Sequence, residues 1–199
     1  TWEFGGGMIT DWGAHHIDIA QWALDADASG PVEVRAPDGW ETAKRGAQLV
    51  YRNGVVLSHV RGKGVSFYGS EGEVHVNRGK FEFVMDGKTV HKFWDRETDR
   101  GTSLDREVIL TEREFLADAK VKLTPTSSHF QDFLDAVQAR RRPICDVEIG
   151  ARSVIACHLM NFAYHYGANA GWDPQRNAFT RGGDRKWLTR ERYRNGWKV

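Results

Sequence analysis

Apolar and polar residues follow different periods along the chain, and the changes of period divide it into four stretches. Residues 1–25 contain a glycine-rich turn and then a helical pattern, and residues 32–94 contain short segments in which apolar and polar positions alternate. Residues 104–167 contain longer segments with helical spacing, and residues 168–199 form a tail rich in arginine and tryptophan. This order of elements predicts an α+β fold in a single domain.

The alternating segments between residues 32 and 94 are separated by turn residues. Asn53-Gly54 lies between two apolar alternations, which is a strong hairpin signal. Connections this short join antiparallel neighbours. We therefore predict a mainly antiparallel open sheet of about six strands, covered on one face by helices. Its six strands are expected near residues 48–51, 55–60, 65–68, 74–76, 81–85 and 89–93, after a short alternating strand at 32–35.

Three helices are predicted after the strands. A charge-rich segment at 104–119 has a weak helical pattern, and residues 128–138 have a firmer one, with Ser128 and Gln131 placed as a capping box. The third helix runs from an N-cap at Asp146 to a stop at Gly167. Because it is apolar around most of its circumference, we expect it to lie buried between the sheet and another layer. The tail is expected to wrap its aromatic residues onto the domain.

Composition narrows the kinds of partner. The chain has 199 residues, a formal net charge of +1 and two cysteines. A net charge this small gives no field that would steer a polyanion, and no apolar run reaches the roughly 18 residues of a membrane helix. Although arginines and aromatics alternate in the tail, we predict no nucleic-acid partner and no membrane partner. Two cysteines without ligand spacing favour a reducing compartment, so a cytoplasmic location is expected.

The candidate chemistry lies in the first helix, within GGGMITDWGAHHIDIAQWAL. At about 100° per residue, Asp11, His15 and Asp18 fall on one narrow arc, together with Trp22. His16 points the other way. The pattern places it in the middle or at the rim of an apolar face predicted to pack on the core, made of Ile9, Trp12, Ile19, Ala20 and Ala23.

An aspartate one turn before a histidine suits general acid-base chemistry. Asp11 can hold the His15 ring in one tautomer, which leaves the other ring nitrogen free to exchange a proton with a substrate hydroxyl. A metal site is disfavoured, because only Asp11, His15 and Asp18 share a face and no further ligand cluster is near in the sequence. The alternative is that Asp11 and His15 form a pair on the helix surface that only stabilises the helix slightly. The spacing alone does not distinguish this structural role from the catalytic one.

Several segments, in a consistent order, resemble the C-terminal domain of the glucose-fructose oxidoreductase, inositol dehydrogenase and rhizopine-catabolism (Gfo/Idh/MocA) family. The most specific is the glycine-rich turn with D-x-G-x-H-x-x-D, which begins at Asp11. The others are the strand pair around NGV, the segment YGSEG, the helix HFQDFLDAV with its basic end, RPICDVEIG and the late WDP. The resemblance covers nearly the whole chain.

The resemblance implies an enzyme of two domains, in which an N-terminal Rossmann domain binds NAD or NADP. His15 matches the family's catalytic histidine, which accepts the proton of the hydroxyl being oxidised, and Asp11 matches the aspartate beside it. We predict these two as catalytic residues and place Asp18, Trp12 and His16 among the substrate-binding candidates. The chain departs from the family in one large respect, because it has no G-x-G-x-x-G that follows a strand and opens a helix. Its cofactor-binding residues are thus expected in the missing N-terminal domain, and the chain alone is expected to be inactive.

We therefore expect residues 1–199 to be the substrate-binding and oligomerisation half of an NAD(P)-dependent oxidoreductase that acts on a sugar, cyclitol or polyol. A dimer or tetramer is expected to form through the sheet face. Two alternatives stay open: an NAD-dependent glycoside hydrolase of the same family, and a scaffold domain without chemistry. The opening at Thr1, without an initiator methionine, indicates a cut chain, and it leaves open a secretion signal upstream.

Overall fold

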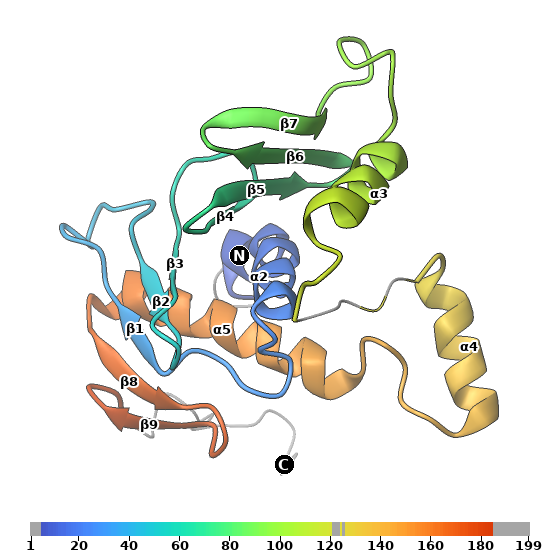
Figure 1. The fold of residues 1–199 in the computed structure, drawn as a ribbon. Coiled ribbons are helices and arrows are strands. Elements are labelled where there is room, and N and C mark those ends of the chain that lie inside the picture. The colour runs from blue at the N-terminus through green and yellow to red at the C-terminus, as the bar shows by residue number, and fades with distance from the viewer. Residues whose placement is uncertain (1–4, 121–123, 125, 185–199) are drawn as a thin grey trace. The chain divides into compact units, whose positions relative to one another are not determined.

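A computed structural model describes residues 5–120, 124 and 126–184 of the chain, and it confirms the α+β class (Figure 1). Contacts between Cα atoms divide the chain into two compact units, one comprising residues 1–60 and 126–199 and the other residues 61–125. Each unit has its own antiparallel sheet. The assignment of residues 1–199 to one substrate-binding and oligomerisation domain stays a prediction.

The first unit contains a five-stranded sheet in the order β3-β2-β1-β8-β9, and every pair in it is antiparallel. The hairpin predicted at Asn53-Gly54 joins β2 to β3, with Leu49 opposite Leu57. Of the last two strands, β8 pairs with β1 and β9 pairs with β8, and neither strand was predicted. The five strands are β1 (Glu33–Arg35), β2 (Gln48–Val50), β3 (Val56–Ser58), β8 (Ala170–Asp173) and β9 (Ala178–Arg181).

The second unit is a four-stranded meander in sequence order, with helix α3 (Leu104–Phe115) in contact with β6 and β7. The phenyl rings of Phe83 and Phe115 lie 5.1 Å apart between centroids, so α3 packs on the apolar face of this sheet. The predicted strands thus exist, but they are divided between two sheets. The four strands are β4 (Val65–Tyr68), β5 (Gly72–Asn77), β6 (Lys80–Met85) and β7 (Lys88–Phe93).

The helix ends carry the predicted caps, except that the Ser128–Gln131 capping box is half formed, because the Gln131 side chain donates to Asp135 instead of accepting from Ser128. The Ser128 hydroxyl accepts a hydrogen bond from the Gln131 N–H at the start of α4 (His129–Ala139). Asp146 accepts from two N–H groups at the start of α5 (Val147–Tyr166). Gly167 ends α5 with a φ of 61°, in the left-handed region that glycine tolerates best. These caps fix where α4 and α5 begin and where α5 ends.

Helix α5 organises the first unit. It contacts β1 and β2 as well as helix α2 (Trp12–Ala23) and the short 3-10 turn η1 (Gly7–Ile9), so it is buried between layers as predicted (Figure 1). The buried core draws on α2, α5 and the sheet, which fixes α2 against the rest of the unit. Its members include Ile17, Val34, Leu49, Tyr51, Cys157, Leu159, Met160, Phe162 and Trp172.

One hydrogen bond within this core gives a stability prediction. The Tyr51 hydroxyl donates to the Gln21 side-chain oxygen over 2.6 Å, and Gln21 is 1% exposed. Tyr51→Phe strands that oxygen, so we expect the free energy of unfolding to fall by about 1–3 kcal/mol. Replacing both partners, in Tyr51→Phe/Gln21→Leu, should destabilise by less than the sum of the single variants. Urea denaturation measures both effects, and additive losses would contradict the coupling.

The described part of the tail pairs with the sheet. The Arg181 guanidinium lies 2.6 Å from a carboxylate oxygen of Glu33, and the rings of Trp172 and Phe179 are in edge contact. The remaining tail residues of the prediction, 185–199, lie outside the described residues. Among the described helices, none combines the length and the hydropathy needed to cross a membrane.

Candidate functional site

Two glycines at positive φ form the turn that precedes α2, the helix that carries the candidate site residues. Gly6 has a φ of 76° and Gly7 a φ of 72°. A Cβ at Gly6 would lie 2.7 Å from the Thr10 side chain, so this position requires glycine. The Thr10 hydroxyl donates to the carbonyl oxygens of Gly5 and Gly7, and the Asp11 N–H also donates to Gly7. These hydrogen bonds fix the turn and so set the direction in which α2 begins.

The buried face of α2 differs from the predicted one. Its buried residues are Ile17, Ala20 and Gln21, whereas Trp12, placed on the core face by the sequence pattern, is 49% exposed. Gln21 explains the difference, because its side chain is satisfied inside the core by Tyr51 and by the carbonyl of Ala26. A hydrophobicity pattern treats glutamine as a solvent-facing residue and so rotates the helix the wrong way.

His15 and Asp11 lie on the exposed side of this helix. Both side chains are exposed, and the His15 ring lies edge-on to the Trp12 ring with 6.1 Å between centroids. Asp11 occupies the N-cap position without a side-chain cap. Within the described residues, no hydrogen bond or ion pair joins the Asp11 carboxylate to His15. The predicted pair therefore shares a face without a direct bond, and both side chains face solvent.

Two of the predicted substrate residues have other surroundings. The Asp18 carboxylate accepts a hydrogen bond of 2.6 Å from the Ser153 hydroxyl of α5, so the structure gives Asp18 a contact that holds the helix. His16 is half-buried at the rim of the helix. Exposed apolar side chains of this segment are Met8, Trp12 and Trp22, which are 68%, 49% and 38% exposed, and the Trp12 ring lies beside His15.

Sequence reasoning missed two α5 residues that contact this segment. The Asn161 side-chain N–H donates to the Gly6 carbonyl over 2.6 Å, and Ser153 bonds Asp18. Both are buried polar residues in a helix that is otherwise apolar on its buried side. A polar residue inside an apolar stripe was the signal that could have indicated them, since such groups need a partner.

A group of carboxylates lies beside the end of α2. Burial, together with Asp18, Asp25 and Asp146, raises the pKa of Asp27 above its ordinary value of 3.8. One oxygen of this carboxylate is buried without a hydrogen-bond partner among the described residues. Because this pKa is raised on folding, the folded protein holds the Asp27 proton more tightly than the unfolded chain does. The favourable contribution of Asp27 to the free energy of unfolding is therefore present at low pH and is lost as pH rises through the folded pKa.

Asp27→Asn is therefore expected to raise the free energy of unfolding at pH 7, and the gain should shrink as pH falls towards 3.8. Urea denaturation at several pH values measures the difference. Asp38→Asn, at an exposed loop position, is the matched control and should leave stability unchanged. A gain for Asp27→Asn that persists undiminished at acid pH would contradict the electrostatic cause.

The second unit contains a polar cluster of its own. On its sheet, the two His75 ring nitrogens lie 2.8 Å from the Ser66 hydroxyl and 3.1 Å from a Glu73 carboxylate oxygen. His75 is 5% exposed and Ser66 is its cross-strand partner. Because the ring is shielded from solvent and both nitrogens are engaged, this cluster ties β4 to β5.

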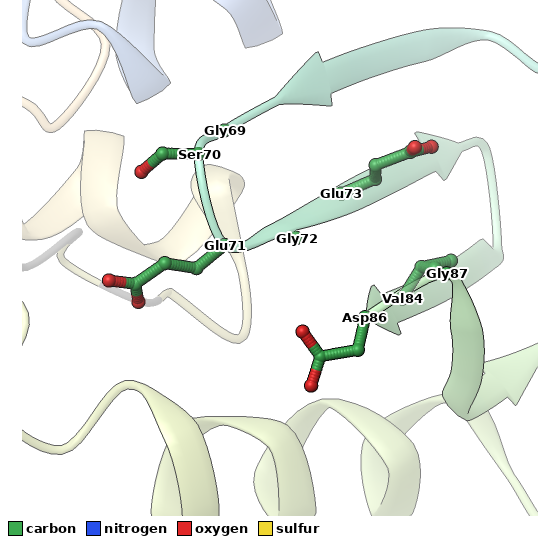
Figure 2. A pocket seen from close by; sticks show the side chains of 8 residues that line it. All are labelled: Gly69, Ser70, Glu71, Gly72, Glu73, Val84, Asp86 and Gly87. Atoms are coloured by element: carbon green, nitrogen blue, oxygen red, sulfur yellow. The ribbon is translucent and has the colours of Figure 1, made fainter.

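A shallow hollow also lies in the second unit, at the turn between β4 and β5 and at the hairpin between β6 and β7. Figure 2 shows that the Glu71 and Asp86 side chains extend on one side of it, whereas Glu73 extends on the other. None of the predicted site residues lines it. In the part of the chain that the structure describes, no group of histidine, cysteine and carboxylate side chains is arranged to hold a metal ion.

Comparison with protein-family models gives no match for this chain, and comparison with curated proteins gives none either.

Proposed function

We propose that this chain is the substrate-binding and oligomerisation half of an NAD(P)-dependent oxidoreductase that acts on a hydroxyl of a sugar, cyclitol or polyol. The observation that carries the proposal is the two-sided character of α2. One side, with Ile17 and Gln21, is locked into the core, and the other presents His15 to solvent. The D-x-G-x-H-x-x-D pattern of the sequence lies on this helix, and its resemblance to the Gfo/Idh/MocA family supports this reaction class.

The described residues do not themselves form a dinucleotide site. Every strand pair in both sheets is antiparallel, whereas the dinucleotide fold is built from parallel strands joined by helices. We therefore propose that NAD or NADP is held by a Rossmann domain outside this chain. When bound, the nicotinamide supplies the hydride acceptor.

The residues of this chain supply the proton chemistry and the orientation. The substrate hydroxyl donates its proton to a ring nitrogen of His15 as the carbinol carbon is oxidised. Asp11, one turn earlier on the same face of the helix, stabilises the charge of the imidazolium that forms. Trp12 offers an apolar ring beside His15, which suits the carbon face of a sugar or cyclitol. Homo-oligomers are proposed to form through an open sheet face.

The test uses the natural protein that contains this chain. It is incubated with NAD or NADP and, separately, with glucose, myo-inositol, other free sugars and polyols, and aryl glycosides. Net formation of reduced nicotinamide with a free sugar or cyclitol is the expected result. Release of the aglycone without net reduction would instead assign the NAD-dependent glycoside hydrolase. Neither activity, with a stable oligomer, would favour the scaffold domain and contradict the proposal.

A further inference from the structure

Two polar side chains stand out on the buried side of α5. Ser153 is 4% exposed and Asn161 is 5% exposed, and they are the polar members of a set of eight buried residues in this helix. Both direct their hydrogen bonds to the segment that carries His15. A buried polar group needs a hydrogen-bond partner, and both of these α5 residues find theirs in the segment that carries His15.

Asn161 acts on the side of His15 that precedes it in the sequence. Its side-chain nitrogen donates to the Gly6 carbonyl over 2.6 Å, at the first of the two positive-φ glycines. The next carbonyl, that of Gly7, accepts from the Asp11 N–H over 3.1 Å. Asn161 therefore fixes the turn that sets where Asp11 and the first turn of α2 begin.

Ser153 acts on the side that follows His15. Its hydroxyl donates over 2.6 Å to the carboxylate of Asp18, which lies one helical turn beyond His15. Because the acceptor is charged, this hydrogen bond is of the stronger kind. The two contacts thus bracket the histidine, one at the entry to the helix and one after it.

These contacts add direction to a helix that apolar packing already holds. Ile17 of α2 lies in the buried core cluster, and each hydrogen bond to α5 is a modest addition to that packing. A directional bond on each side does limit sliding and rotation of the helix. A shift of about 1 Å in a catalytic group can cost on the order of 100-fold in rate.

We propose that Asn161 and Ser153 are positioning residues, which hold α2 so that His15 faces the substrate hydroxyl. The proposal rests on the proposed function for the role of His15. The placement of the helix itself is a property of this chain and can be measured without turnover.

The experiment compares Asn161→Leu with Asn169→Leu. Asn169 is the control, because its side chain also makes one hydrogen bond to the backbone, accepted from the Ala36 N–H over 2.8 Å, at an exposed position outside α2 and α5. The first readout is amide hydrogen exchange of residues 10–16, together with the ring resonances of His15. Asn161→Leu should speed this exchange at least tenfold and shift those resonances, and Asn169→Leu should change neither.

The second readout is turnover by the natural protein with the sugar or cyclitol found in the screen above. Asn161→Leu and Ser153→Ala should lower kcat about tenfold or more, with KM within about twofold, because substrate contacts remain and the base is displaced. Ser153→Thr keeps the hydroxyl and should restore most of kcat. Urea denaturation of each variant verifies that it is folded.

The outcomes are separable. Faster exchange near His15 with unchanged kcat would overturn the positioning role, as would an equal loss of kcat in Asn169→Leu. Unchanged exchange and ring resonances in Asn161→Leu would overturn it as well, whatever the activity. If the wild-type protein has no activity with nicotinamide cofactors, the proposed function fails. The exchange and resonance data would then still decide whether Asn161 sets the position of His15.

Discussion

If the protein is the oxidoreductase proposed above, His15→Asn is expected to lower its kcat by roughly 10²–10⁴-fold. Asparagine keeps a polar side chain at an exposed helix position, so the fold and the burial of Ile17 on the opposite side should be undisturbed. It offers no group that can take the proton of the substrate hydroxyl near neutral pH. Steady-state turnover with NAD or NADP measures the loss, and cofactor affinity should remain unchanged.

Two histidines serve as controls. His129 is exposed on α4 of the same unit, and His129→Asn should leave kcat within about twofold because surface substitutions away from a site are mild. His16, half-buried at the rim of α2, is the neighbour in sequence. His16→Asn should lower the free energy of unfolding more than it lowers kcat. Loss of turnover in His16→Asn with normal turnover in His15→Asn would reverse the assignment of the base.

Leu49→Ala is expected to destabilise the first unit by about 2–5 kcal/mol. Leu49 lies in the middle of β2, is fully buried, and belongs to the cluster that contains Ile17 of α2 and Met160 of α5. Truncation removes apolar contacts and leaves a cavity that close-packed neighbours fill only in part. Urea denaturation followed by far-UV circular dichroism measures the loss.

The control is the same substitution at an exposed site. Leu134, on α4 of the same unit, is 43% exposed, so Leu134→Ala should change stability by no more than about 0.5 kcal/mol. Comparable losses in the two variants would mean that the buried cluster around Leu49 does not dominate the stability of this unit.

The local elements were predictable from the sequence because their signals are local. Asn53-Gly54 gave the β2-β3 hairpin, and Asp146 and Gly167 gave the ends of α5, since turn and cap residues act within a few positions. The division into two sheets was not predictable in this way. It depends on the pairing of β1 with β8, across more than half of the chain, and no periodic pattern encodes that partner.

Strands β8 and β9 were missed for a related reason. The sequence of β8, Ala-Gly-Trp-Asp, has small and acidic residues that are poor strand formers. Its strand conformation depends on its two neighbours, because Val34 of β1 pairs with Ala170 and Phe179 of β9 pairs with Trp172. Tertiary context therefore overrides propensity at this end of the chain.

The candidate site was predictable in part. The exposed positions of Asp11 and His15 agree with the spacing argument, whereas Trp12, predicted on the core face, is exposed, and Gln21, which the prediction did not include, is buried. The error came from one buried glutamine whose partners, Tyr51 and Ala26, are on other segments. The contacts of Asn161 and Ser153 on α2 likewise join residues more than 100 positions apart, which sequence spacing alone does not connect.

The most direct test of the central claim is single-turnover formation of reduced nicotinamide by the intact protein, compared between the wild type and His15→Asn. We expect His15→Asn to react roughly 10²–10⁴-fold more slowly than the wild type, because the group that takes the hydroxyl proton is removed. His129→Asn should react within about twofold of the wild-type rate. An equal single-turnover rate in His15→Asn and the wild type would contradict the assignment of His15 as the general base.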